Sequence, residues 1–101
     1  MQINVDTKEH TAKLVLNGRF DFNSHRAFRD ACDQAIQASG VKEIEVDFSH
    51  VEYLDSSALG MLLLLREKAQ RVNTKVSLTH CTGIVQQVLE VANFQQLFTI
   101  K

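Results

Sequence analysis

The residues best placed to do chemistry are two adjacent serines, Ser56 and Ser57, which follow Asp55 in the middle of the chain. An apolar-periodic run begins directly after them, which predicts a helix from about Ser56 to Val72. The first N–H groups of a helix have no intrahelical partner and carry partial positive charge. A serine there could simply cap the helix, or it could carry a phosphate that the same N–H groups stabilise. The local chemistry leaves both interpretations open.

A serine hydrolase fits this segment poorly. The nucleophile elbow Gly-x-Ser-x-Gly is absent. The four histidines, His10, His25, His50 and His80, are scattered, so the sequence places none of them beside Ser56 as a general base. No Gly-x-x-x-x-Gly-Lys loop for ATP is present. We therefore predict no enzyme activity and no catalytic residues, and we expect neither a metal site nor a cofactor.

Length and composition predict one ordinary globular domain, spanning residues 1–101. Hydrophobic residues make up 45% and charged residues 23% of the chain. Eleven basic and twelve acidic side chains give a net charge of -1, which argues against a nucleic-acid partner. No stretch of about 18 uncharged apolar residues could span a membrane, and the first residues lack the features of a signal peptide. We expect a cytoplasmic protein without membrane insertion, in which Cys32 and Cys81 are reduced and buried.

Strands and helices are predicted to alternate along the chain. Strands are expected at Met1–Asp6, at Lys13–Asn17 with a stop at Gly18, at Glu43–Phe48 and at Val76–Thr79. Helices are expected over 24–38, capped by Asn23 or Ser24, and over 56–72. Thr82 is expected to cap a short third helix whose inward residues are Ile84, Val85, Val88 and Leu89, and a packing tail of Phe94, Leu97, Phe98 and Ile100 follows. Several of the connections between predicted strands are long and contain a predicted helix. Such helical crossovers join parallel strands, so part of the sheet should be parallel.

The segment Glu43–Phe48 predicts how the sheet is covered. Its apolar residues, Ile44, Val46 and Phe48, alternate strictly with three acidic residues. A strand buried on both faces would not tolerate that alternation. The prediction is an α/β fold whose helices cover one face of the sheet more than the other.

Three motifs together resemble the STAS family, the anti-sigma factor antagonists. The run Leu54-Asp55-Ser56-Ser57-Ala58-Leu59-Gly60, with the leucine-rich helix after it, resembles the family signature. Gly18-Arg19-Phe20-Asp21 is similar to the Gly-x-x-Asp that ends the second strand, and Glu45-Val46-Asp47-Phe48 resembles the strand before the phosphorylation loop. The resemblance covers nearly the whole chain. It implies a STAS-like mixed sheet of four to five strands with helices packed mainly on one face.

The resemblance also implies a function. In such antagonists the serine directly after the aspartate is phosphorylated, which is Ser56 here. The implied partner is an anti-sigma factor that is also the serine kinase, an ATPase of the histidine-kinase type, which the unphosphorylated protein binds and sequesters. A PP2C-like phosphatase is the implied second partner. The alternative within the family is a STAS subunit of an ABC-type lipid transporter, which docks on its ATPase without a phosphorylation cycle.

Four residues are expected to support the switch at Ser56: Asp21, Asn23, Asp55 and Ser57. Asp21 is expected close to Ser56 if the fold holds, although it could instead stabilise the start of the first helix. Ser57 fits a local hydrogen-bonding role better than that of a second phosphate acceptor.

The expected partner-binding surface comprises Ala58, Gly60, Met61 and Leu64. Ala58 stands where such proteins commonly have glycine, so its methyl group would restrict close approach of a partner's backbone. At 100° per residue, the core stripe of this helix consists of Ala58, Met61, Leu62, Leu65, Ala69 and Val72. Leu63 and Leu64 fall outside that stripe. Two leucines beside a candidate switch serine indicate a partner surface, and the alternative is that Leu63 is partly buried at the flank of the helix.

Overall fold

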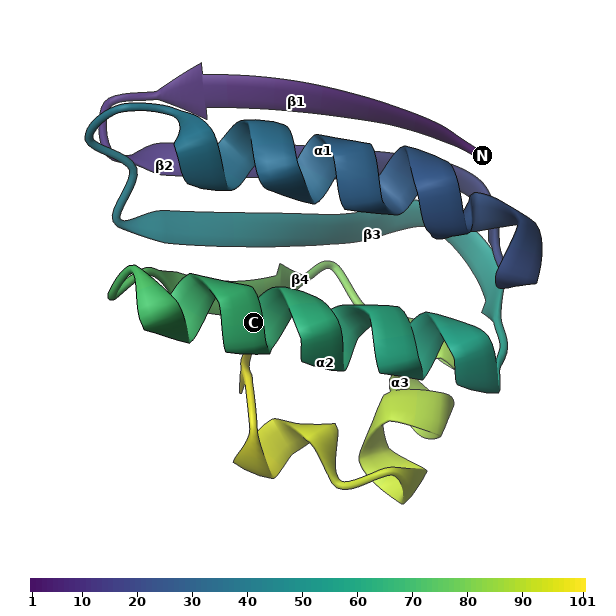
Figure 1. Ribbon diagram of the computed structural model, residues 1–101. Coiled ribbons are helices and arrows are strands. Elements are labelled where there is room, and N and C mark those ends of the chain that lie inside the picture. The colour runs from purple at the N-terminus through teal and green to yellow at the C-terminus, as the bar shows by residue number, and fades with distance from the viewer.

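Glycines and polar turns divide the chain into alternating strands and helices, as the periodicity predicts. The computed structural model describes residues 1–101 (Figure 1). In chain order the elements are β1 (Gln2–Lys8), β2 (Thr11–Phe20), the 3-10 helix η1 (Phe22–Ser24), α1 (His25–Gln37), β3 (Glu43–Leu54), α2 (Ser56–Arg71), β4 (Lys75–Thr79), α3 (Gly83–Val91), the 3-10 helix η2 (Phe94–Gln96) and β5 (Thr99–Ile100). None of the helices has the length and apolar character needed to cross a membrane.

The sheet has five strands in the order β1-β2-β3-β4-β5. β1 pairs with β2 in antiparallel fashion, and every later pair is parallel. Each connection between parallel strands therefore leads to the next strand of the sheet, always in the same direction. Right-handed crossovers of this kind put their helices on the same face. Figure 1 shows α1 and α2 lying side by side over that face. The predicted mixed sheet with helices mainly on one face is confirmed.

The core lies between this face and the helices. Its strand residues alternate with outward-facing ones, as at Ile44, Val46 and Phe48, which are all buried. The ring of Phe20 lies 4.9 Å from that of Phe28 and 6.2 Å from that of Phe48, measured between centroids. These contacts join the end of β2 to α1 and β3, so apolar packing holds the strand ends next to the helix starts.

Two strands are longer than the sequence predicts. β2 does not stop at Gly18 but continues to Phe20, because Gly18 adopts φ 117° and the strand passes it with a shift in register. β3 continues past Phe48 to Leu54, since its second half still pairs with β2. The pairing of Phe20 with Leu54 makes both strands end at the same place. This places Asp21 beside Asp55.

Smaller differences concern single side chains. Val72 is not in the core: α2 ends at Arg71, and Val72 follows as an exposed C-cap. In the packing tail Phe94 and Phe98 are buried, whereas Leu97 is exposed. Cys32 is buried, and burial raises the pKa of its thiol to about 12. Cys81 was expected to be buried and is only half-buried.

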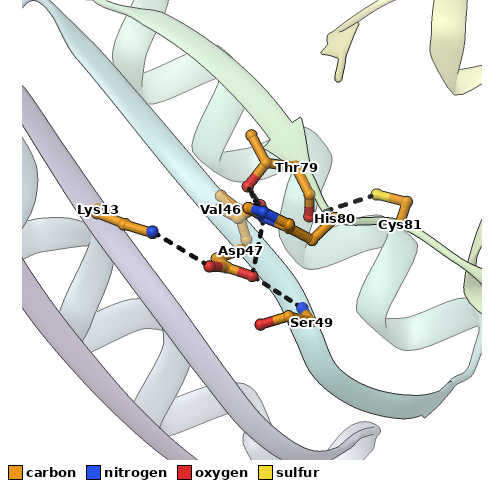
Figure 2. Close-up of polar contacts among 7 residues, drawn as sticks. All are labelled: Lys13, Val46, Asp47, Ser49, Thr79, His80 and Cys81. Carbon is orange, nitrogen blue, oxygen red and sulfur yellow. Dashed lines mark hydrogen bonds and ion pairs between the residues drawn. The ribbon is translucent and has the colours of Figure 1, made fainter.

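The sheet face that carries no helices is covered by ion pairs instead. Asp47 on this face is only 5% exposed. Its carboxylate lies 3.4 Å from Nζ of Lys13 and 3.4 Å from Nδ1 of His80, and it accepts the Ser49 N–H at 2.8 Å (Figure 2). Burial alone would raise the pKa of Asp47, but the Ser49 hydrogen bonds and the neighbouring side chains of His80 and Lys13 outweigh it. The pKa of Asp47 therefore lies below its ordinary value.

This carboxylate makes stability depend on pH. Because the pKa of Asp47 is lower in the folded chain than in the unfolded one, its charge stabilises the fold above about pH 4, and that contribution is lost as the pH falls through the folded pKa. We expect Asp47→Asn to lower the free energy of unfolding by about 1–2 kcal/mol at pH 7. The difference from wild type should shrink below about pH 4. Urea unfolding at several pH values measures both effects, and a difference that does not change with pH would contradict this account.

Candidate switch site at the N-terminus of α2

Asp55 determines where α2 begins. Its backbone is extended, with φ −111° and ψ −176°, and its side chain caps the helix. The oxygen Oδ1 accepts the N–H of Ala58 at 3.1 Å and the hydroxyl of Ser57 at 2.5 Å. The Ser57 hydrogen bond is the main cause that lowers the pKa of Asp55. The cap is therefore an ionised carboxylate that satisfies one orphan N–H of the helix and holds Ser57.

The two serines have different environments. Ser56 is the first residue of α2 and is exposed, and its hydroxyl makes no hydrogen bond within the chain. Ser57 is half-buried, and its hydroxyl donates to Asp55. Ser56 thus offers an accessible hydroxyl beside the free N–H groups of a helix N-terminus, whereas the Ser57 hydroxyl is part of the cap.

Asp21 caps the 3-10 helix η1 that precedes α1. Its Oδ1 accepts the N–H of Asn23 at 3.0 Å, and its own N–H donates to Oγ of Ser24 at 3.3 Å. The expectation that the side chain of Asn23 or Ser24 caps the first helix is therefore wrong. Ser24 instead donates its hydroxyl to the carbonyl of Arg19 at 2.9 Å, because the chain enters α1 through a 3-10 turn. The alternative that Asp21 stabilises the start of the first helical segment is the one the structure supports.

Asp21 also lies next to the switch segment. The N–H of Asp55 donates to the carbonyl of Phe20 at 3.2 Å, so the residues after β2 and after β3 are neighbours. The N–H of Phe22 contributes to lowering the pKa of Asp55. The Asp21 carboxylate is paired with Arg19 at 3.6 Å. The carboxylates of Asp21 and Asp55 therefore both lie at the end of the sheet where α2 begins, and that of Asp21 is paired with Arg19.

Two of the four residues of the expected partner surface are exposed, and the other two are buried. Gly60 is exposed, and Leu64 is 52% exposed. Ala58 and Met61 are buried in the core, so they cannot contact a partner, and the expectation for these two is wrong. Their positions follow from helix phase, which turns both toward the sheet. The methyl group of Ala58 therefore packs inside the protein and does not restrict a partner's approach.

Some exposed apolar residues near this site were not predicted. Phe22 follows Asp21 and is 75% exposed, and α3 exposes Ile84 and Val91. The periodicity predicts that Ile84, Val85, Val88 and Leu89 face inward. Val85 and Leu89 are buried and Val88 is half-buried, but Ile84 is 51% exposed, so the expectation for Ile84 is wrong. Thr82 occupies the N-cap position of α3 as expected, but its side chain makes no capping hydrogen bond. No three metal-ligating side chains converge anywhere in the structure.

The hydrogen bonds predict that the side chain of Ser57 contributes to the stability of the fold and that the side chain of Ser56 does not. Ser57→Ala removes the 2.5 Å bond to Asp55 and should lower the free energy of unfolding by about 1 kcal/mol. Ser56→Ala removes no bond within the chain and should change it by less than about 0.5 kcal/mol. Urea unfolding of both variants tests the difference. An equal loss for Ser56→Ala would show that its hydroxyl has a structural role.

Comparisons with known proteins identify the family of this chain. The family model described as "Mlab, STAS domain" matches residues 3–99. A STAS-domain containing protein of Pseudomonas aeruginosa (strain UCBPP-PA14) is 46% identical over 87 residues, which is 86% of this chain and 84% of that protein.

Solved structures share the fold at lower identity. The Bacillus anti-sigma factor antagonist SpoIIAA aligns in its unphosphorylated form with a TM-score of 0.76 and 20% identity, over 99% of this chain and 87% of that one. Its phosphorylated form aligns with a TM-score of 0.74 and 18% identity, over 99% and 91%. A sulfate transporter family protein from Wolinella succinogenes aligns with a TM-score of 0.76 and 15% identity, over 90% and 73%. The family match and the P. aeruginosa relative together show that this chain belongs to the STAS-domain family.

Proposed function

We propose that this protein is a phosphorylation-switched anti-sigma factor antagonist. In its unphosphorylated form it binds and sequesters an anti-sigma factor that is also a serine kinase of the histidine-kinase-like ATPase type. The observation that carries the proposal is the exposed hydroxyl of Ser56, which is free of internal hydrogen bonds at a capped helix N-terminus. A kinase can reach such a hydroxyl, and the fold does not need it. The existence of SpoIIAA in an unphosphorylated and a phosphorylated form supports the same interpretation.

The charges around Ser56 explain how a phosphate would act. Phosphorylation adds about -1.5 to -2 charges near neutral pH. Asp55 is adjacent, already ionised and fully used as the cap, and Asp21 lies across the strand ends. A partner surface that fits the neutral hydroxyl would then meet a multiply charged group beside two carboxylates, so binding should be lost. A PP2C-like phosphatase would restore the binding form.

Gly60 supports a close contact with the partner. It lies in the exposed interior of α2, where glycine costs about 0.5–1 kcal/mol relative to alanine. An added Cβ there would meet nothing within 4 Å in this chain. Space inside the protein therefore does not require glycine, whereas a partner backbone lying against this turn of α2 would. Leu64, exposed one turn further on, extends the same proposed surface.

The alternative is a STAS subunit of an ABC-type lipid transporter, docked on its ATPase without a phosphorylation cycle. The sulfate transporter family protein from W. succinogenes has the same fold, so the architecture also occurs in a transporter family. Both proposals include binding to an ATPase. They differ in whether Ser56 controls that binding.

A binding experiment on Ser56 variants separates the two. The partner would be isolated from native cells with Ser56→Ala protein as bait, purified, and titrated by calorimetry. We expect Ser56→Ala to bind as tightly as the unphosphorylated wild type, and Ser56→Asp to bind about tenfold more weakly or worse. Protein phosphorylated in vitro should bind most weakly, because one carboxylate imitates a phosphate only in part. Equal affinities for all forms would contradict the switch and favour the transporter subunit.

A further inference from the structure

A polar pocket lies between the C-terminal half of α2 and the segment that follows α3. Its volume is about 480 Å³. Arg66 and Gln70 of α2 line one side, residues 95–99 line the other, and the start of β4 completes the lining. Figure 1 shows this C-terminal segment, drawn in yellow, next to α2. Arg66 comes ten residues after Ser56, about 15 Å further along the helix, so the pocket is separate from the candidate switch site.

The lining of this pocket carries positive charge and no negative charge. Arg66 and Lys75 are its two charged residues, and no aspartate or glutamate takes part. The amide side chains of Gln70, Gln95 and Gln96 add neutral hydrogen-bonding groups. A pocket of several hundred cubic ångströms with a few convergent polar groups has the dimensions of a small-molecule site. Its charge favours an anion.

Arg66 is held in place and keeps one edge of its guanidinium free. Its Nε donates to the carbonyl of Leu97 at 2.9 Å, which ties the side chain to the opposite wall of the pocket. The two terminal nitrogens keep four N–H groups, which can hold two oxygens of one oxyanion at once. Arg66 has no carboxylate partner within the chain, and Glu67, the next residue, pairs instead with Arg71 at 3.0 Å. An oxyanion can therefore bind Arg66 without displacing an internal partner.

Lys75 also forms no ion pair. It is exposed and is the register partner of Glu43 on β3. Glu43, however, accepts the hydroxyl of Ser77 at 2.8 Å and pairs with Lys101 at 3.2 Å. The carboxylate nearest in register to Lys75 is therefore already compensated, and Lys75 adds positive potential at the pocket.

The lining also indicates what kind of molecule carries the anionic group. Phe98 is the one aromatic residue of the pocket, and it is only 5% exposed and stacks on Phe94 with 5.3 Å between centroids. No open ring is therefore available to stack on a nucleobase. The glutamine amides can instead donate to and accept from hydroxyl groups. These features fit a polyhydroxylated molecule better than a nucleotide.

We propose that this pocket binds a small polyhydroxylated phosphomonoester, such as a sugar phosphate. Its phosphate contacts Arg66 and Lys75, and its hydroxyls contact the glutamine amides. A phosphomonoester carries about -1.5 to -2 charges near neutral pH, which matches two cations better than the single charge of a carboxylate does. The site is independent of the proposed phosphorylation of Ser56.

Titration of the full chain with glucose 6-phosphate, followed by amide NMR, tests this proposal. We expect saturable shifts at Arg66 and Gln96, with a Kd below about 1 mM, and none at Ser56. Arg66→Gln should weaken binding by about tenfold or more, because the guanidinium holds the phosphate. Arg26→Gln is the matched control: Arg26 is an exposed arginine of α1 outside the pocket, and its replacement should change the affinity by less than about twofold.

A second variant leaves the hydrogen bond between Arg66 and Leu97 in place. Gln96→Glu adds a carboxylate to the lining and should also weaken binding by about tenfold or more. Urea unfolding of both variants shows whether they remain folded. If Arg66→Gln does not fold, the affinity of Gln96→Glu decides.

Three further ligands separate the outcomes. Glucose 6-phosphate should bind at least about fivefold more tightly than inorganic phosphate or AMP, and glucose should not bind. Equal binding of inorganic phosphate would show an adventitious ion only and would overturn the proposal, as would tighter binding of AMP. No saturable shift below about 10 mM, or equal effects of Arg66→Gln and Arg26→Gln, would overturn it too. Because none of these measurements involves Ser56 or a kinase, failure of the phosphorylation switch would leave the result unchanged.

Discussion

The hydrogen bonds that Asp55 accepts from Ala58 and Ser57 are the interaction on which the candidate switch site depends. They fix the first turn of α2, commit the hydroxyl of Ser57 to the cap, and leave the hydroxyl of Ser56 outside it. They also set the phase of the helix, which sends Ala58 into the core and Leu63 toward solvent. One capped helix start therefore separates a structural serine from an accessible one, and it aligns the accessible one with an exposed apolar surface.

The sheet makes this arrangement possible because helices cover one of its faces and polar and charged side chains cover the other. Three crossovers in the same direction leave one face without helices. That face is stabilised by networks such as the one that joins Asp47 to Lys13 and His80 (Figure 2). All three helices are then available on the other face, and their outer surfaces can form contacts without disturbing the core.

The sequence predicts the parts of this structure that depend on local periodicity and capping. Strict alternation up to Phe48 identified a sheet covered on one face, and the order of Asp55 and Ser56 before an apolar run identified the helix start. The extension of β2 past Gly18 depends on pairing with a distant strand, which local patterns do not reveal. Ala58 was misassigned to the surface although its helical phase turns it inward. The 3-10 entry to α1 was missed because short capping turns give weak signals. Ile84 was placed inward although it is exposed, because a short helix with apolar residues on two adjacent sides does not define which side is buried.

The central claim is that the fold separates a modified serine from a structural one, and the most direct measurement is the phosphorylation state of the native protein. Protein purified from its own cells under several growth conditions, with phosphatases inhibited during lysis, would be analysed by fragmentation mass spectrometry across residues 54–66. The account predicts phosphate on Ser56 in at least one condition and none on Ser57, whose hydroxyl is committed to Asp55. Phosphate on Ser57, or an unmodified Ser56 in every condition, would contradict it.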